Sequence, residues 1–260
     1  MIETTRHDDV TAYRLSWWRS RLIDYGVHIF QVRGVLIDTG FPAALREVRA
    51  ILARQPVRGI FVTHAHEDHA GNVPWLAARR LPMALAPATQ RLLEQAHPIG
   101  FYRRFTWQST PRLQQDILPF TDPAFSLIPA PGHAPDHHVV WDAETRTLFA
   151  GDLFLGVKVR LGHPYNDPRA EVASIQSLLA LAPTRVFCAH RGLLPNGVAL
   201  LQAKADWLTT LIGQTEALAD AGRSVGAIRA ELLGPRPMTH WYSRGEYSPD
   251  NLIRAILRGR

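Results

Sequence analysis

The chain has 260 residues, of which 46% are hydrophobic and 20% charged, as in an ordinary globular protein with one large domain or a domain with an appendage. Its net charge of +6 is a weak argument for a nucleic-acid partner, because nearly all its basic residues are arginines and such a composition also arises from a GC-rich coding sequence. The single cysteine excludes an intrachain disulfide framework and a thiolate-rich zinc site, and no apolar run reaches the length of a membrane span.

The first part of the chain alternates between strand-like and helix-like segments. A helix is predicted over residues 43–54, because Leu45, Val48, Ile51 and Leu52 recur at helical spacing on one face. The other predicted elements are strands at 13–18, 26–34 and 35–40, a buried strand at 58–64, a helix at 68–80, a strand at 82–88 and a helix at 89–97.

Residues 98–115 interrupt this alternation. The segment contains four aromatic residues and three arginines but no acid. We expect a flap that closes over a bound substrate, with a surface loop or the contact of a homodimer as the alternatives. Arg suits carboxylate or phosphate groups, and the aromatic residues would supply an apolar wall.

The second part returns to strands and then becomes helical. Strands are predicted at 125–131, 137–143, 147–152 and 184–190, with a helix at 171–181 opened by the Asp167–Pro168 pair. Further helices are predicted at 198–222, 224–234 and 248–260. We therefore expect an α+β domain over residues 1–196 and a helical extension over residues 197–260 that packs on it.

A dense group of metal-capable side chains follows the predicted strand at 58–64. His64, His66, Asp68 and His69 fall between an apolar run and a glycine, in the stretch FVTHAHEDHAG. Side chains at a strand-to-helix turn can point to one place, so the group is a candidate metal site.

Three more metal-capable residues each lie just beyond a predicted buried strand. His133 occurs in PAPGHAPDHH, Asp152 in LFAGDLF and His190 in VFCAHRG. Strand ends carry their side chains to one edge of a sheet, and the adjacent glycines allow close packing. Imidazole and carboxylate suit zinc, with iron or manganese as alternatives. Seven ligands exceed the needs of one ion, and they predict two divalent ions that share a carboxylate and hold a hydroxide.

These motifs, THAHEDHAG, PGHAPDHH, FAGD and AHRG, resemble the metallo-β-lactamase fold superfamily, and the earlier VLIDTG also fits. The resemblance implies a four-layer αβ/βα sandwich with a dinuclear site at one edge. It assigns His64, His66 and His133 to one metal, Asp68, His69 and His190 to the other, and Asp152 to the bridge. Asp38 and Thr39 match the strand-end turn beneath the site, where a supporting role is expected.

The ligand pattern is closer to glyoxalase II, lactonases and the lactamase-like endoribonucleases than to true β-lactamases. The best-known lactamase subclasses place Cys or a further His where this chain has Asp152, so we expect no antibiotic hydrolysis. The superfamily is chemically broad, and its fold alone does not fix the substrate. The helical extension is similar to the C-terminal module of the endoribonuclease group.

The first function predicted is hydrolysis of an ester, thioester or lactone of a small anionic substrate. A metal-bridging hydroxide would attack the carbonyl, and Asp68 would orient this nucleophile as the catalytic residue. The predicted substrate-binding residues are Tyr102, Arg103, Trp107, His163 and Arg191. His163 lies where glyoxalase II relatives bind their thiol carrier, although the match to that pattern is poor.

Two other functions stay open. Residues 223–260 hold seven arginines against three acids, with neighbouring aromatic residues, a combination that suits a phosphodiesterase or endoribonuclease acting on nucleic acid. The alternative there is a solvated helical surface. A non-catalytic metal-bearing module is the third hypothesis. We expect a cytoplasmic protein without a membrane partner, because the N-terminal residues lack the apolar core of a secretory signal.

Overall fold

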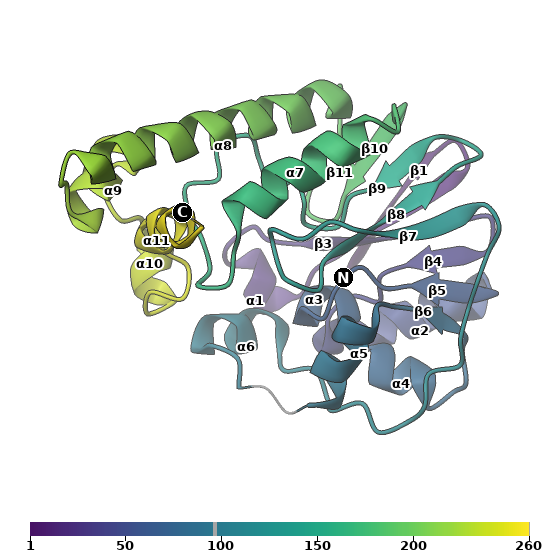
Figure 1. The fold of residues 1–260 in the computed structure, drawn as a ribbon. Coiled ribbons are helices and arrows are strands. Elements are labelled where there is room, and N and C mark those ends of the chain that lie inside the picture. Colours follow the sequence, from purple (N-terminus) through teal and green to yellow (C-terminus); the bar gives the residue numbers. More distant parts are fainter. Residues whose placement is uncertain (96–97, 260) are drawn as a thin grey trace.

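The computed structural model describes residues 1–95 and 98–259, and it contains two β-sheets that pack face to face (Figure 1). The first sheet has the strand order β1 (Ile2–His7), β2 (Val10–Leu15), β3 (Val27–Val32), β4 (Val35–Ile37), β5 (Gly59–Phe61), β6 (Met83–Ala84). Its first four strands are antiparallel neighbours, whereas β4, β5 and β6 run parallel.

The second sheet has the order β11 (Gly192–Leu193), β10 (Arg185–Cys188), β9 (Thr147–Phe149), β8 (His138–Asp142), β7 (Phe125–Pro129). Strands β9 and β10 are parallel, and α7 (Pro168–Leu179) connects them. Because β8 is antiparallel to both β7 and β9, the carboxyl ends of β7, β9 and β10 lie at the same edge.

The core between the sheets is rich in aromatic residues. Phe30 of the first sheet lies 5.5 Å from Phe149 and 5.3 Å from Phe187 of the second, measured between ring centroids. Phe149 and Phe187 are fully buried. Such ring pairs bury large apolar areas and hold the two sheets in one arrangement.

Helices cover the outer face of each sheet, which confirms the predicted four-layer α+β sandwich (Figure 1). The first sheet packs against α2 (Leu45–Arg54), α4 (Val73–Ala77) and α5 (Pro87–Glu94), while the second packs against α7 and α8 (Gly197–Asp220). The predicted apolar face of the 43–54 helix is present in α2, where Val48 and Ile51 are buried.

The C-terminal helices share a small apolar cluster of their own. Helix α8 continues into α9 (Val225–Leu233), α10 (Met238–Tyr242) and α11 (Pro249–Arg258). Leu211, Ile228 and Ile253 are buried together in this cluster. The division into a domain of residues 1–196 and an extension of residues 197–260 stays a prediction.

Several predicted elements differ from those observed. Strand β1 was not predicted, because its mostly polar side chains are exposed at the sheet edge and it is held by backbone pairing with β2. The predicted strand at 13–18 ends at Leu15, and α1 (Trp18–Arg21) follows. The segment 98–115 contains α6 (Phe101–Trp107). The predicted helix at 89–97 ends at Glu94, and its residues 96–97 lie outside the described part of the chain.

The predicted helix at 68–80 is divided into α3 (Glu67–Ala70) and α4, with Asn72 between them. The Asn72 side-chain amide donates to the carbonyl oxygens of Thr39 at 2.7 Å and Phe41 at 3.1 Å. Gly71 packs so closely on this turn that a Cβ there would lie 2.7 Å from the Gly40 carbonyl oxygen. The residues between α3 and α4 are therefore hydrogen-bonded to the turn of residues 39–41, which precedes η1 (Pro42–Ala44), and they hold α3 against it.

None of the helices in residues 1–95 and 98–259 combines the length and the hydropathy that a membrane-spanning segment requires.

Candidate metal centre

The seven predicted ligands converge at the sheet edge formed by the carboxyl ends of β7, β9 and β10. His133, Asp152 and His190 lie just beyond these three strands, and His64 lies just beyond β5. The remaining ligands are carried by the turn into α3. Their donor atoms form two groups, within each of which all atoms lie within 4.8 Å of one another: His64, His66, His133 and Asp152; Asp68, His69, Asp152 and His190.

The first group is formed by three imidazoles and one carboxylate. His66 Nδ1 lies 2.9 Å from His64 Nε2 and 3.2 Å from His133 Nε2. Asp152 Oδ2 lies 3.4 Å from His133 Nε2. Burial lowers the pKa of His64 and of His66 well below the ordinary value, so both imidazoles are neutral and offer the lone pairs that a metal requires.

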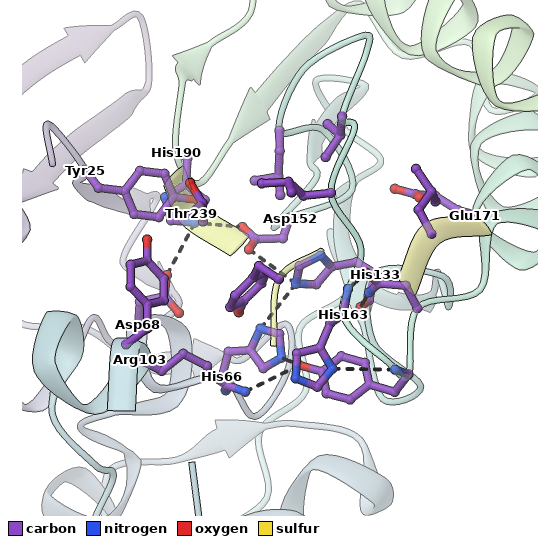
Figure 2. Close-up of a pocket in the computed structure, with 18 of the residues that line it drawn as sticks. Tyr25, His66, Asp68, Arg103, His133, Asp152, His163, Glu171, His190 and Thr239 are labelled. Atoms are coloured by element: carbon purple, nitrogen blue, oxygen red, sulfur yellow. Dashed lines mark hydrogen bonds and ion pairs between the residues drawn. The ribbon is translucent and has the colours of Figure 1, made fainter. Parts of the chain in front are cut away.

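The second group combines two imidazoles with two carboxylates. Asp152 Oδ1 lies 3.2 Å from His69 Nε2 and 3.3 Å from His190 Nε2. Asp68 Oδ2 lies 3.3 Å from His190 Nε2. Asp152 therefore turns one carboxylate oxygen toward each group, which is the arrangement of a bridging ligand (Figure 2).

The outward-facing ring nitrogens of these histidines are held by other groups. His69 Nδ1 lies 2.7 Å from Asp38 Oδ2, so it donates to this carboxylate and directs Nε2 toward the site. His190 Nδ1 donates to the Gly26 carbonyl oxygen at 2.8 Å, and His66 Nε2 lies 2.5 Å from the Tyr165 hydroxyl. These contacts fix the ring orientations before any ion binds.

The turn that carries Asp152 depends on His137 and Gly151. His137 Nε2 accepts a hydrogen bond from the Asp152 backbone N–H at 3.1 Å, and burial lowers the pKa of His137 to about 3, so its ring stays neutral. Gly151 has φ of +51°, and a Cβ there would lie 2.7 Å from His137 Nε2. Only glycine accommodates both the left-handed backbone and this close contact.

The charge distribution of the second group is that of a cation site. Burial opposes charge on His69 and His190, but the carboxylates of Asp152 and Asp68 raise both pKa values, that of His190 to about 10. His69 Nε2 and Asp152 Oδ1 are buried and lie 3.2 Å apart, but neither atom makes a hydrogen bond of acceptable geometry within residues 1–95 and 98–259. A buried polar group without a partner is costly, and a divalent cation would satisfy both atoms. The residues present therefore fit a metal site.

A pocket of about 630 Å³ opens beside the two groups, and Figure 2 shows the side chains that line it. Four of the predicted substrate-binding residues, Tyr102, Arg103, Trp107 and His163, belong to its lining. Arg191 does not: its side chain is exposed, and its guanidinium donates to the Leu155 carbonyl oxygen at 3.4 Å. A role for Arg191 toward substrate stays a prediction.

Arg103 and His163 are both engaged with acids of this chain. The Arg103 guanidinium binds Glu67 through Nε at 3.0 Å and Nη2 at 2.7 Å, a buried two-point contact. His163 Nε2 lies 3.4 Å from Glu246 Oε1. Trp107 is almost completely buried and contributes one wall of the pocket.

Several residues of the pocket were not predicted as site residues. Tyr25 stacks on His190, with ring centroids 4.4 Å apart, and Glu171 pairs with Lys204 inside the pocket. Thr239 reaches the pocket from the C-terminal helices (Figure 2). The only signal for this set in the sequence is Lys204, one of two lysines, which stands in an otherwise apolar helix face.

Comparisons with known proteins agree with this geometry. A family model described as "Metallo-beta-lactamase superfamily" matches residues 33–190. A hydroxyacylglutathione hydrolase from Thiobacillus denitrificans is 30% identical over 210 residues, covering 79% of this chain and 72% of the relative. The probable metallo-hydrolase YybB from Bacillus subtilis is 28% identical over 166 residues, covering 60% of this chain and 74% of the relative.

A solved structure shares the fold over nearly the whole chain. A metallo-beta-lactamase family protein from Thermus thermophilus has a TM-score of 0.65 at 17% sequence identity, covering 97% of this chain and 94% of that chain. The C-terminal helices therefore have a counterpart in that protein.

Proposed function

Since the chain belongs to the metallo-β-lactamase superfamily of hydrolases, we propose that it is a dinuclear zinc hydrolase that cleaves an ester, thioester or lactone. The observation that carries this proposal is the position of Asp152, which directs Oδ2 to His133 at 3.4 Å and Oδ1 to His69 at 3.2 Å. A carboxylate placed between two groups of ligands suits two ions better than one.

The ligand assignment follows the two groups. His64, His66 and His133 would hold one ion, Asp68, His69 and His190 the other, and Asp152 would bridge them. Zinc fits because imidazole nitrogens and carboxylate oxygens are its usual ligands in the absence of cysteine. The single thiol, Cys188, is buried and donates to the Phe154 carbonyl oxygen, so it takes no part.

Two ions bound there would supply an activated water at neutral pH and would polarise the scissile carbonyl. The protein's own contribution is to fix positions. Asp68 would orient the attacking water through the carboxylate oxygen that does not face His190. Asp38 and Tyr165 hold the rings of His69 and His66, and the pocket beside the two groups would seat the substrate.

Hydrolysis of a carbonyl substrate is favoured by the similarity to a hydroxyacylglutathione hydrolase, whose name describes a thioester substrate. The competing phosphodiesterase hypothesis depends on free arginines in residues 223–259. Four of them are engaged within the chain. Arg236 binds Asp250 through two nitrogens and Arg223 lies 3.3 Å from Glu231, while Arg229 and Arg258 donate to the carbonyl oxygens of Gly234 and Pro164. Cleavage of nucleic acid is therefore kept as an outcome of the test.

The test is metal analysis followed by an assay panel on one preparation. Zinc content would be measured on the purified protein, which would then be given a thioester, a lactone, an aryl ester, a β-lactam, a phosphodiester and single-stranded RNA. We expect two equivalents of zinc and chelator-sensitive cleavage of a carbonyl substrate. Asp152→Asn should lose metal and activity together, whereas Asp206→Asn, at an exposed position of α8, should lose neither.

Two other outcomes would contradict the proposed carbonyl hydrolase. Cleavage of phosphodiesters or RNA without cleavage of any carbonyl substrate would replace this proposal by the nuclease alternative. Less than one equivalent of metal after loading, with no activity on the panel, would contradict the dinuclear hydrolase.

A further inference from the structure

The pocket has a polar end and an apolar end. The metal-ligating groups form the polar end, and the C-terminal helices form much of the rest. Leu208 of α8, Met238 and Tyr242 of α10 and Leu252 of α11 all line the same cavity. The loop after Asp152 adds Leu155, Val159 and Leu161 to the lining. Although Asn166 and Thr239 also line the cavity, a substrate whose carbonyl reaches the ligand groups would therefore lay most of its remaining part against aliphatic and aromatic side chains.

The two strongly basic side chains in the described lining of this pocket are both neutralised by acids of this chain. Arg103 makes its two-point contact with Glu67, and its side chain is only 11% exposed. Lys204 Nζ donates to Glu171 Oε1 at 2.5 Å and to the Leu153 carbonyl oxygen at 2.6 Å. Away from the metal ligands, an anionic substrate group would therefore find no unpaired strongly basic side chain in the described lining, and competition with either buried pair is costly.

The mouth of the pocket is also apolar. Ile23, Met238 and Tyr242 line it and are 41%, 79% and 43% exposed. Ile23 follows α1, and Met238 and Tyr242 belong to α10. Figure 1 shows both helices on the same side of the molecule as α6. An apolar substrate group too long for the cavity would continue along these side chains into solvent, so the chemistry of the mouth matches that of the interior.

We propose that the substrate is neutral and carries an extended apolar group, such as a medium or long acyl chain, that lies between the loop after Asp152 and the C-terminal helices. This inference rests on the proposed hydrolase function and names the substrate class for the same site. It differs from the sequence-based expectation of an anionic substrate, which relied on the arginines of residues 98–115 and on Arg191; of these, Arg103 is paired with Glu67 and Arg191 lies outside the described lining. A charged thiol carrier and nucleic acid are both disfavoured for the same reason.

The first experiment is a chain-length series on the zinc-loaded enzyme. Neutral p-nitrophenyl esters of two, four, six and eight carbons, or the corresponding lactones, would be compared with S-lactoylglutathione. Each methylene buried in the pocket should raise kcat/KM about fourfold, mainly through KM, until the chain reaches the mouth. Equal kcat/KM for all chain lengths, or a preference for the glutathione thioester, would overturn the proposal while leaving the hydrolase function intact.

Matched variants locate the binding wall. Ile23→Glu and Met238→Glu introduce a charge at exposed positions of the mouth, so neither should affect folding. We expect each to lower the ratio of kcat/KM for the eight-carbon substrate to that for the two-carbon substrate at least tenfold. Leu22→Glu is the control, because Leu22 precedes Ile23, is 68% exposed and lies outside the described lining. An equal effect of Leu22→Glu would contradict the proposed wall.

A binding measurement separates this inference from the proposed function. The neutral dye N-phenyl-1-naphthylamine should fluoresce on binding to the metal-free protein and should be displaced by octanamide but not by glutathione. This result would support the apolar site even if no ester, thioester or lactone were cleaved, in which case only the hydrolase proposal would fail. Absence of dye binding to wild type, or displacement by glutathione, would overturn the inference.

Discussion

Replacement of Lys204 by methionine tests how the C-terminal helices support the candidate site. The Lys204 side chain is 3% exposed, and its ammonium donates to Glu171 and to the carbonyl oxygen of Leu153, the residue after Asp152. Methionine has a similar length and no charge. The variant therefore leaves a buried carboxylate and a buried carbonyl oxygen without their donor, beside the turn that positions Asp152.

The expected cost follows from the burial of the partner. Removal of one member of a buried ion pair destabilises a protein by about 3–5 kcal/mol. The Glu171 side chain is 14% exposed and retains some contact with water, so the lower end, about 3 kcal/mol, applies. At about 2–4 °C per kcal/mol for a chain of this size, Tm should fall by about 6–12 °C.

The assay is thermal unfolding of the metal-free proteins, followed by circular dichroism. Lys158→Met is the control, because Lys158 is the other lysine and is exposed, so its removal should change Tm by no more than about 2 °C. The double variant Lys204→Met, Glu171→Gln should recover much of the loss, since it also removes the unpaired charge. A Tm for Lys204→Met equal to that of the control, or a double variant no more stable than the single one, would refute the reasoning.

Three further predictions concern the site. Asp38→Asn weakens the hydrogen-bond acceptor of His69 Nδ1, so it should lower zinc affinity about 10–100-fold in a competition titration with a chromophoric chelator. Unchanged zinc affinity would show that Asp38 does not support metal binding through His69. Zinc affinity should rise with pH across the neutral range, because the pKa of His190 is raised to about 10 and this residue must lose its proton to bind metal. A zinc affinity that does not depend on pH would contradict this prediction. So would zinc binding that releases no proton into a weakly buffered solution of a pH-indicator dye. Cys188 should resist a disulfide reagent in the folded protein and react after denaturation, because the thiol is buried and burial raises its pKa to about 12. Fast labelling of the native protein would show that the thiol at the end of β10 is accessible to the reagent.

The placement of the candidate ligands could be predicted because it depends on local rules. A metal-capable residue just beyond a buried strand reaches the sheet edge whatever the details of packing, and β7, β9 and β10 each supply one in this way. The spacing within residues 64–69 is similarly local, since one turn into α3 presents all four side chains. The alternation of apolar strands with amphipathic helices predicts sheets covered by helices, whereas the four-layer sandwich was predicted from the resemblance to the superfamily.

The shape and charge of the pocket could not be predicted, because they depend on contacts between distant segments. Arg103 and Glu67 are both visible in the sequence, but nothing local indicates that they pair across α6 and α3. Lys204 and Glu171 are likewise joined only by the packing of α8 on α7. The sequence also gives no reason to expect that α10, which it does not predict, supplies the mouth of the cavity.

The pairing of these charges explains how a basic chain can form a pocket whose described lining has no unpaired strongly basic side chain. The net charge of +6 describes the whole molecule, whereas the pocket lining contains three carboxylates, on Asp68, Asp152 and Glu171, and two strongly basic side chains that already have partners. The carboxylates of Asp68 and Asp152, which no strongly basic side chain of the described lining neutralises, therefore attract divalent cations to the metal-free site. Away from the metal ligands most of the described lining is aliphatic or aromatic, so discrimination among substrates would come mainly from the length and shape of an apolar group. Selection by methylene groups is gradual, so we expect an enzyme that accepts a range of chain lengths rather than a single substrate.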